Sequence, residues 1–570
     1  MFGSLWLGLV ACAVTEEAPP REVDPTVVTS TPPPDATDTG AVTSSLPTDT
    51  SSGTDTAPPL PDLPKATVGA TVLTGPRRHC VSPQDRAERP FDTRDLQVFY
   101  TDGDGYAGSA LVVADLFGDG RPALFFGGDR FTLYRAATRG WDEVSEAVLP
   151  LLDMRHIVTG SAADYDGDGD FDLFLGGNGE NYLLENREGV FHDISDEVWE
   201  SRAWWTTVSS SWADLDGDGD LDLMVGNYAG DGVRTVVDVH PSELYLNEGG
   251  QFIDVSDRLP SETQDSFVFM TALLDVGGDH LPELFSIHGF SGSGPSRLLH
   301  NVEGESWALD DASGFHPNFD GMGIAFADLN DDGAPDIAQT SHNSISLRLS
   351  SPSADALSGW AWEIEHAGAY GVTIDVADRG QSVGWGLEFG DLDNDTDQDL
   401  VGTFGFWETF PKEGLNYDAL WLQGADGQFE DVAEGWGVDD PGVGRGLALA
   451  DLNRDGWLDI IKRDIRGSVA RVHHARCGEA GWVGIRPTQP ETLNHHAIGA
   501  TVDVWTRATR QRRWIMAGST SMFSSTVPEA HFGLGDHLGV DAVVVTWPDG
   551  EVSVVEGLEG HRWHRILRAP

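Results

Sequence analysis

The feature that most constrains this chain is an aspartate-rich loop of nine residues that recurs between short apolar runs. The fullest copy reads DYDGDGDFD at residues 164–172. The first aspartates of successive copies lie 49 to 63 residues apart, a length that suits four short strands and their connections. Self-similarity at such a period predicts repeated supersecondary units. Loops 1 to 7 begin, in order, at Asp115, Asp164, Asp214, Asp275, Asp328, Asp391 and Asp451.

A second motif lies between the loops and predicts a hairpin at the outer edge of each unit. It reads NYLLENREGVFHDIS at 181–195, LYLNEGGQFIDVS at 244–256 and LWLQGADGQFEDVA at 420–433. Two apolar runs around a glycine-containing turn are typical of paired antiparallel strands. A single unit cannot bury both faces of its sheet, so the units must pack on one another. We therefore predict an all-β chain with a seven-bladed β-propeller over residues 90–475; an open stack of sheets is the alternative.

The loops carry the hard oxygen ligands that calcium prefers, about six to eight of them per ion. In residues 164–172 the first, third and fifth positions supply side-chain oxygens, the seventh a backbone carbonyl and the ninth a closing carboxylate. Gly169 permits the sharp turn. Without a cation these carboxylates would repel one another, although an acidic turn without metal is the alternative. The predicted metal ligands are Asp164, Asp166, Asp168, Asp170 and Asp172; Asp214, Asp216, Asp218, Asp220 and Asp222; Asp328, Asn330, Asp332 and Asp336; Asp391, Asp393, Asp395, Asp397 and Asp399; and Asp451, Asn453, Asp455 and Asp459.

Loops 1 and 4 depart from the pattern. Phe117 and Ala123 replace ligands in loop 1, whereas Gly277 replaces a ligand and His280 the turn glycine in loop 4. We expect both loops to keep the turn and lose tight binding, which leaves about five calcium ions. In loop 6, Thr396 stands where the turn glycine is expected.

The net charge of −58, from 93 acidic and 35 basic residues, makes nucleic acid and anionic lipid unlikely partners. The segment from Gly289 to Ser293 lacks the last glycine of a nucleophile elbow, and metalloprotease, P-loop and dinucleotide patterns are absent from the sequence. We predict that the protein is not an enzyme, although propeller folds also host enzymes.

The N-terminal residues predict export. Cys12 ends a short apolar run whose last residues, LVAC, are typical of a lipobox, so we expect residues 1–12 to be a signal peptide with lipidation at Cys12; plain secretion is the alternative. Residues 13–65 are rich in Thr, Pro, Ser and Asp and predict a disordered tether. Cys80 and Cys477 lie just outside the two ends of the repeats, where a disulfide would tie a closed ring; two free thiols are the alternative.

After residue 480 the aspartate loops stop, and short alternating runs predict a small antiparallel β domain over residues 480–566. Its basic patch fits an acidic glycan, the acidic propeller or an ordinary solvated hairpin. The patch consists of Arg507, Arg510, Arg512 and Arg513.

The loops and the alternating hairpin motif resemble FG-GAP or VCBS repeats, the units of integrin-type propellers, over roughly residues 90–470. The sequences AIGATVDVW (497–505) and HFGLGDHLGVDAVVVTWPDG (531–550) resemble the ASPIC and UnbV domain. Together they resemble the cartilage acidic protein family and its bacterial relatives. The resemblance implies a seven-bladed propeller, structural calcium in the blades and a role in adhesion or matrix interaction.

From these features we expect a surface adhesion or interaction module that binds an unknown protein or glycan and is held at the cell envelope by a lipid. We expect it to be a monomer and to meet the membrane only through that lipid. The alternative is a carbohydrate-active enzyme of the lyase or hydrolase type, or a sugar-binding protein, that uses the propeller face.

Overall fold

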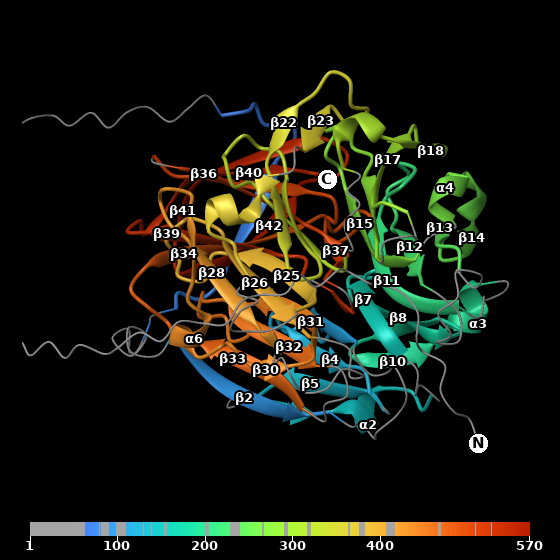
Figure 1. Ribbon diagram of the computed structural model, residues 1–570, viewed down its shortest axis with the longest axis horizontal. Helices are drawn as coiled ribbons and strands as arrows, with labels where there is room; N and C mark the ends of the chain where they lie inside the picture. The colour runs from blue at the N-terminus through green and yellow to red at the C-terminus, as the bar shows by residue number, and fades with distance from the viewer. Residues whose placement is uncertain are drawn as a thin grey trace, which may run out of the picture. The chain divides into compact units, whose positions relative to one another are not determined.

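Each aspartate loop joins the first two strands of a four-stranded antiparallel sheet in the computed structural model of the chain (Figure 1). In the second sheet, β7 (Ile157–Ala163) is buried along its whole length and pairs with β8 (Asp172–Gly179). The register joins Ala163 to Asp172, so loop 2 is the turn of this hairpin. Strands β9 (Tyr182–Arg187) and β10 (Val190–Asp193) complete the sheet and form the outer hairpin that the second motif predicts.

The same arrangement recurs in seven sheets of the described chain, which we number as their loops. Sheets 1 and 3 to 7 consist of β3 (Leu111–Ala114), β4 (Ala123–Phe126), β5 (Thr132–Ala136) and β6 (Trp141–Glu143); β11 (Trp205–Ala213), β12 (Asp222–Asn227), β13 (Glu243–Asn247) and β14 (Phe252–Asp254); β15 (Val268–Leu274), β16 (Glu283–His288), β17 (Arg297–Val302) and β18 (Ser306–Leu309); β19 (Ile324–Ala327), β20 (Asp336–Thr340), β21 (Ile345–Arg348) and β24 (Glu365–His366); β25 (Gly384–Gly390), β26 (Asp399–Phe404), β28 (Ala419–Gln423) and β29 (Phe429–Asp431); and β31 (Gly444–Ala450), β32 (Asp459–Asp464), β33 (Val469–Ala475) and β2 (Phe91–Gln97).

The described residues are 63–570 with the exception of 79, 81–89, 99–109, 129, 138–139, 153–156, 200–204, 229–239, 265–266, 290–293, 316–320, 363–364, 375–381, 406–415, 465–468, 508, 522 and 526. The predicted signal peptide, Cys12 and nearly all of the predicted tether lie outside them. The other elements described between β2 and β33 are two strand pairs and seven short helices. The pairs are β22 (Ser350–Pro352) with β23 (Trp360–Trp362) and β27 (Asn416–Tyr417) with β30 (Pro441–Gly442), and the helices are α2 (Ser145–Val148), α3 (Ser195–Val198), η1 (Ser256–Arg258), α4 (Ser261–Gln264), η2 (Asp311–Ser313), η3 (Ala367–Tyr370) and α6 (Ala433–Trp436).

Apolar clusters lie between consecutive sheets and also between the last sheet and the first. Leu111 and Val113 of β3 pack with Ala448 and Ala450 of β31. Sheet 7 is completed by β2, which precedes all the other strands of the seven sheets in the chain. A disulfide between Cys80 and Cys477, outside the two ends of the repeats, links the segment before β2 to the segment after β33. The all-β prediction is confirmed, and the sheets succeed one another as the blades of a propeller do.

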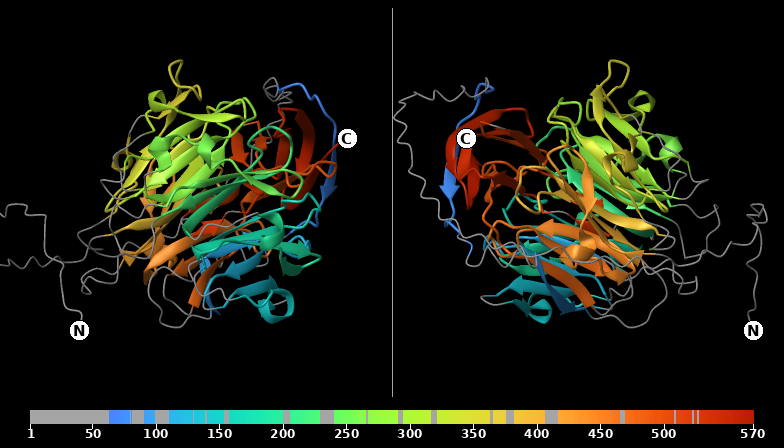
Figure 2. Two further views of the ribbon diagram at one scale, coloured as in Figure 1. Left: turned by 90° about the vertical axis from the view of Figure 1, so that its right-hand side faces the viewer. Right: turned by 60° about the vertical axis from the view of Figure 1, so that its left-hand side comes forward.

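The C-terminal residues form two further four-stranded sheets. One is β1 (Ala70–Thr74), β42 (Arg562–Arg568), β34 (Gly481–Thr488) and β39 (Ala530–Gly535), and the other is β36 (Arg510–Trp514), β35 (Thr501–Trp505), β40 (Gly539–Thr546) and β41 (Val552–Glu559). Both views of Figure 2 show the blue strand β1 beside the red C-terminal strands. Strands β34 and β42 are parallel, so the prediction of a purely antiparallel domain misses this pair. We call the two sheets and the segments between their strands, from residue 481 on, the C-terminal domain.

This domain inserts a hairpin among the first strands of the seven sheets. The hairpin consists of β37 (Ala517–Ser521) and β38 (Ser524–Ser525). Strand β37 pairs antiparallel with β11, and β38 pairs parallel with β3. Between them, the two strands also contact β7, β15, β19, β25 and β31, and Figure 1 places β37 where several of these strands converge. A Cβ on Gly518 would lie 2.6 Å from the carbonyl oxygen of Ser210, so only glycine fits this approach.

Phe523 lies between β37 and β38 and is fully buried at 0% exposure. Its ring belongs to an apolar cluster with Val158, Val208, Phe269 and Trp385, which come from sheets 2, 3, 4 and 6. The described residues from 63 on form one compact unit, and the two predicted domains share one interior.

Replacing Phe523 by alanine should lower the free energy of unfolding by about 3 kcal/mol, because it removes a ring from a closed apolar cluster. Denaturant unfolding measures the change. Leu538→Ala is the control, since Leu538 is 68% exposed and its loss should change stability by no more than about 0.5 kcal/mol. Equal effects of the two substitutions would contradict the buried position of the hairpin.

Candidate metal sites

All seven loops share one backbone geometry, including the two that depart in sequence. The carboxylate at the first position accepts a hydrogen bond of 2.8–3.0 Å from the backbone N–H at the sixth position in every loop. The sixth residue has a positive φ throughout, which explains the glycine preference. Thr396 occupies this position in loop 6 with φ of 99°, a conformation that is strained for a β-branched residue.

The carboxylates in loop 2 converge as calcium ligands would. One oxygen each of Asp164, Asp166 and Asp172 lies within 4.8 Å of the other two. Asp164 is 1% exposed, and its Oδ1 is buried without any hydrogen-bond donor. A buried oxygen without a donor is unfavourable unless a cation completes it, so this donor set fits calcium.

Two other loops have the same convergence. The groups Asp214, Asp216 and Asp218 in loop 3 and Asp391, Asp393 and Asp399 in loop 6 also meet within 4.8 Å. In loops 5 and 7 the third position of the loop is an asparagine instead of an aspartate. Its Oδ1 accepts a backbone N–H, for Asn330 from Asp332 at 3.0 Å and for Asn453 from Asp455 at 2.8 Å. The structure therefore brings three predicted carboxylates together in each of loops 2, 3 and 6, whereas in loops 5 and 7 the asparagine binds the backbone of its own turn.

The carboxylates bear the electrostatic signature of crowded, buried negative charge. Burial first, and then the charges of Asp166 and Asp168, raise the pKa of Asp164 to about 8. Burial likewise raises the pKa of Asp222 to about 9 and that of Asp336 to about 7. A bound cation would favour the charged forms and reverse these shifts.

The ninth position has a structural task that the sequence did not reveal. In loop 2, Asp172 accepts the N–H of Tyr165 at 3.2 Å through Oδ2 and that of Asn186 at 2.7 Å through Oδ1. It therefore ties the loop to the third strand of its own sheet. The corresponding carboxylates make the same two kinds of bond in loops 3, 5, 6 and 7; they belong to Asp222, Asp336, Asp399 and Asp459.

Loops 1 and 4, which we expect to bind calcium poorly, have basic side chains beside their acids. Arg135 Nη2 lies 3.0 Å from Asp119 in loop 1. In loop 4, His300 Nδ1 lies 2.9 Å from Glu283, a fully buried carboxylate, and this hydrogen bond raises the pKa of His300. Sequence reasoning missed both partners because they come from other strands.

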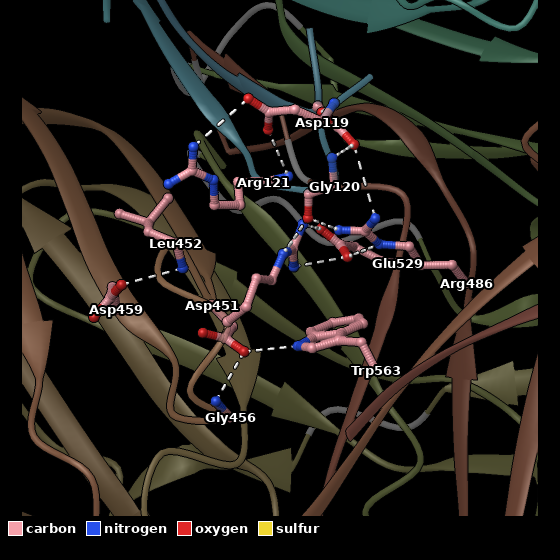
Figure 3. Close-up of polar contacts among 12 residues, drawn as sticks. Asp119, Gly120, Arg121, Asp451, Leu452, Gly456, Asp459, Arg486, Glu529 and Trp563 are labelled. Atoms are coloured by element: carbon pink, nitrogen blue, oxygen red, sulfur yellow. Dashed lines mark hydrogen bonds and ion pairs between the residues drawn. The ribbon is translucent and has the colours of Figure 1, made fainter. Parts of the chain in front are cut away.

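The C-terminal domain packs on the side of the propeller that carries the aspartate loops. Arg454 in loop 7 and Arg486 on β34 both bind Glu529, at 2.9 Å and 2.7 Å, and both donate to the carbonyl of Gly120 in loop 1 (Figure 3). The two guanidinium groups lower the pKa of Glu529 against the effect of burial. Trp563 Nε1 donates to Asp451, the first ligand position of loop 7, at 2.7 Å.

The basic patch of the C-terminal domain also meets the loops. Arg512 Nη1 donates to the carbonyl of Gly333 in loop 5 at 2.7 Å, and Arg510 and Arg512 both bind Asp503. Of the three interpretations of this patch, contact with the acidic propeller is the one the structure contains.

A second concentration of buried charge lies between sheets 6 and 7, away from the loops. Lys462 pairs there with Asp418 and Asp464, while Asp440 pairs with Arg471 and with His473 Nε2 at 2.9 Å. The cavity beside it measures about 10 Å³, which is at the lower limit of what one water molecule requires. These paired charges therefore serve packing.

Comparison with known proteins agrees with these features. The model of the ASPIC and UnbV family matches residues 490–569, and that of the FG-GAP-like repeat matches residues 164–225, which hold loops 2 and 3. The chain carries an FG-GAP-like repeat and an ASPIC and UnbV domain.

Cartilage acidic protein 1 of Mus musculus is 26% identical over 270 residues, which cover 46% of this chain and 39% of that protein. The Xenopus tropicalis protein is 29% identical over 178 residues, covering 29% of this chain and 26% of that protein. The chain thus matches less than half of the length of these curated relatives. Among its described residues, none of the helices is both long and apolar enough to span a bilayer.

Solved structures with a similar backbone include an Agrocybe aegerita lectin that recognises non-reducing terminal N-acetylglucosamine. It has 18% identity and a TM-score of 0.39, over 62% of this chain and 88% of that chain. BBS1N in complex with ARL6DN has 12% identity and a TM-score of 0.40, over 68% of this chain and 98% of that chain.

The calcium-free protein should lose stability as pH rises from about 4 to about 8. The difference in stability between the calcium-loaded and the calcium-free protein should therefore grow over this range. The folded pKa of Asp164, about 8, lies above the unfolded value, so the stability this group contributes is full below about pH 4 and lost as pH passes 8. Calcium needs the deprotonated carboxylates and offsets their repulsion. Melting temperatures with calcium and with chelator should therefore differ more at pH 8 than at pH 5.5. A difference that shrinks as pH rises would contradict the assignment.

Proposed function

We propose that this protein is an exported calcium-binding propeller that acts as a surface interaction module, with calcium in a structural role. The observation that carries the calcium assignment is the Oδ1 of Asp164, buried without a donor among converging carboxylates. The acids of loops 2, 3 and 6 converge in the same way, and those of loops 5 and 7 match them in sequence. About five ions per chain follow from this count.

The structural role follows from the position of the loops. Each loop joins two strands of one sheet. In loops 2, 3, 6 and 7 the ninth carboxylate also accepts a backbone N–H of the third strand, so an ion there would fix three strands of a blade. The C-terminal domain covers loops 1, 5 and 7 with direct hydrogen bonds. An external protein or glycan would therefore bind elsewhere on the molecule.

Export is supported by the bond between Cys80 and Cys477, because such bonds persist in oxidising compartments. We propose that the lipid at Cys12 and the stretch of residues 13–65 hold the folded part away from a membrane. A partner at the cell surface would then be within reach.

Calcium binding is tested by replacing one ligand. Asp166→Ala should reduce the number of bound ions by one, as counted by isothermal titration. It should also lower the gain in stability from calcium by about 2.7 kcal/mol at a calcium concentration 100 times the dissociation constant. Glu197→Gln is the matched control, since it removes an exposed carboxylate from helix α3, just after the last strand of sheet 2, that is not a predicted ligand. If the control changes the stoichiometry as much as Asp166→Ala does, loop 2 is not the site.

Partner binding is tested with the calcium-loaded full chain on a glycan array and on intact cells. We expect binding that survives Glu197→Gln and disappears on heat denaturation. Equal signals from native and denatured protein would contradict a folded interaction surface.

A further inference from the structure

The strongest feature outside the proposed ion sites is a set of hydrogen bonds from the C-terminal domain to the backbone carbonyls of the loops. Five loops give the backbone carbonyl of their sixth residue to a donor of that domain. The pairs are Gly120 with Arg486 at 2.6 Å, Gly169 with His496 Nε2 at 3.2 Å, Gly219 with the N–H of Asn494 at 3.2 Å, Gly333 with Arg512 at 2.7 Å, and Gly456 with His531 Nε2 at 2.9 Å.

Loop 6 uses a neighbouring carbonyl for the same purpose. The N–H of Gly535 donates to the carbonyl of Asn394 at 2.8 Å. A Cβ on Gly533 would lie 2.0 Å from Oδ2 of Asp391, so the domain backbone rests directly on a predicted ligand. A Cβ on Gly167 in loop 2 would likewise lie 2.8 Å from Cα of Leu493.

The direction of these carbonyls depends on the metal ligands. The sixth residue stands between ligand positions five and seven, and its N–H is held by the first ligand. In loop 2 one carboxylate oxygen each of Asp164, Asp166 and Asp172 lies within 4.8 Å of the other two, and Oδ1 of Asp164 is buried without a hydrogen-bond donor, so a cation between these oxygens would hold the turn in this conformation. A turn that relaxes moves its sixth carbonyl away from the donor of the other domain.

The hairpin of β37 and β38 depends on the same docking. It belongs to the C-terminal domain, and its segments pair with β11 and β3 of the propeller. Ser524 Oγ donates to the carbonyl of Leu447 at 2.7 Å and accepts the N–H of the same residue at 3.1 Å. When the domain lifts from the loops, these bonds at the centre of the propeller must break as well.

We propose that calcium is an interdomain clamp: in loops 2, 3, 5 and 7 it holds the sixth carbonyls in place for the C-terminal domain and thereby keeps the hairpin of β37 and β38 inserted among the seven sheets. This inference rests on the calcium binding proposed above. It adds that the ions govern the contact between domains as well as the rigidity of each blade.

Hydrogen exchange on the full-length protein, with calcium and with chelator, tests the clamp. Peptides covering β37 and β38, and residues 493–497 over loops 2 and 3, should exchange faster in chelator than in calcium. If calcium is supplied at 100 times its dissociation constant, the loss of each ion should accelerate exchange by about 100-fold at most. Outer strands such as β10 and β14 should change by less than about threefold. In Asp166→Ala the segment 493–497 should lose much of its calcium-dependent protection, and in Glu197→Gln it should keep it.

Two outcomes overturn the clamp and leave calcium binding intact. One is calcium uptake by titration with unchanged exchange in β37, β38 and residues 493–497; the other is equal acceleration in inner and outer strands, which indicates general destabilisation. The absence of calcium uptake would overturn both proposals. If Asp166→Ala does not fold, the comparison of the native chain with and without calcium still decides between these outcomes.

Discussion

Repulsion among buried carboxylates is the constraint on which the rest of this structure depends. Every repeat places acids in a turn, and burial raises the pKa of several of them, Asp222 to about 9. Loops 1 and 4 have basic side chains from other strands close to their acids, as His300 is to Glu283. Loops 2, 3 and 6 keep three converging acids each, and calcium is the cation we propose for them. The loops therefore differ in how their charge is balanced while they share one backbone geometry.

The C-terminal domain occupies surfaces of the propeller that could otherwise bind a ligand. Its hairpin occupies the place where the first strands of the sheets meet, and Phe523 closes an apolar cluster there. Its donors meet the carbonyls of the loops. A ligand at the centre of the loop side would have to displace this domain, which makes the alternative of a sugar site or an active centre there less favourable.

Much of the fold follows from local sequence signals. The loop period predicts the sheets, and the glycine at the sixth position predicts the turn that Gly169 forms with φ of 97°. The convergence of acids in loops 2, 3 and 6 was also predictable, because these residues lie within nine consecutive positions. The hairpin of β37 and β38 was not, since AGSTS at 517–521 has the composition of a surface turn and only its long-range pairing reveals its position.

Contacts between residues far apart in the chain also account for the features of the sites that the sequence did not predict. The bond of Glu529 to Arg454 and Arg486 joins residues far apart in the chain, and one parallel strand pair in the C-terminal domain joins β34 to β42. Neither has a local signature. The basic patch was visible in the sequence, but its contact with Gly333 depends on how the two domains pack.

Anomalous diffraction from crystals grown with calcium tests the central claim most directly. The account predicts strong peaks within loops 2, 3, 5, 6 and 7, each about 2.3–2.6 Å from the first-position carboxylate, and weak or absent peaks in loops 1 and 4. Equal peaks in all seven loops would contradict the distinction between the loops, and the absence of peaks from loops 2 and 3 would contradict calcium as the cation of this protein.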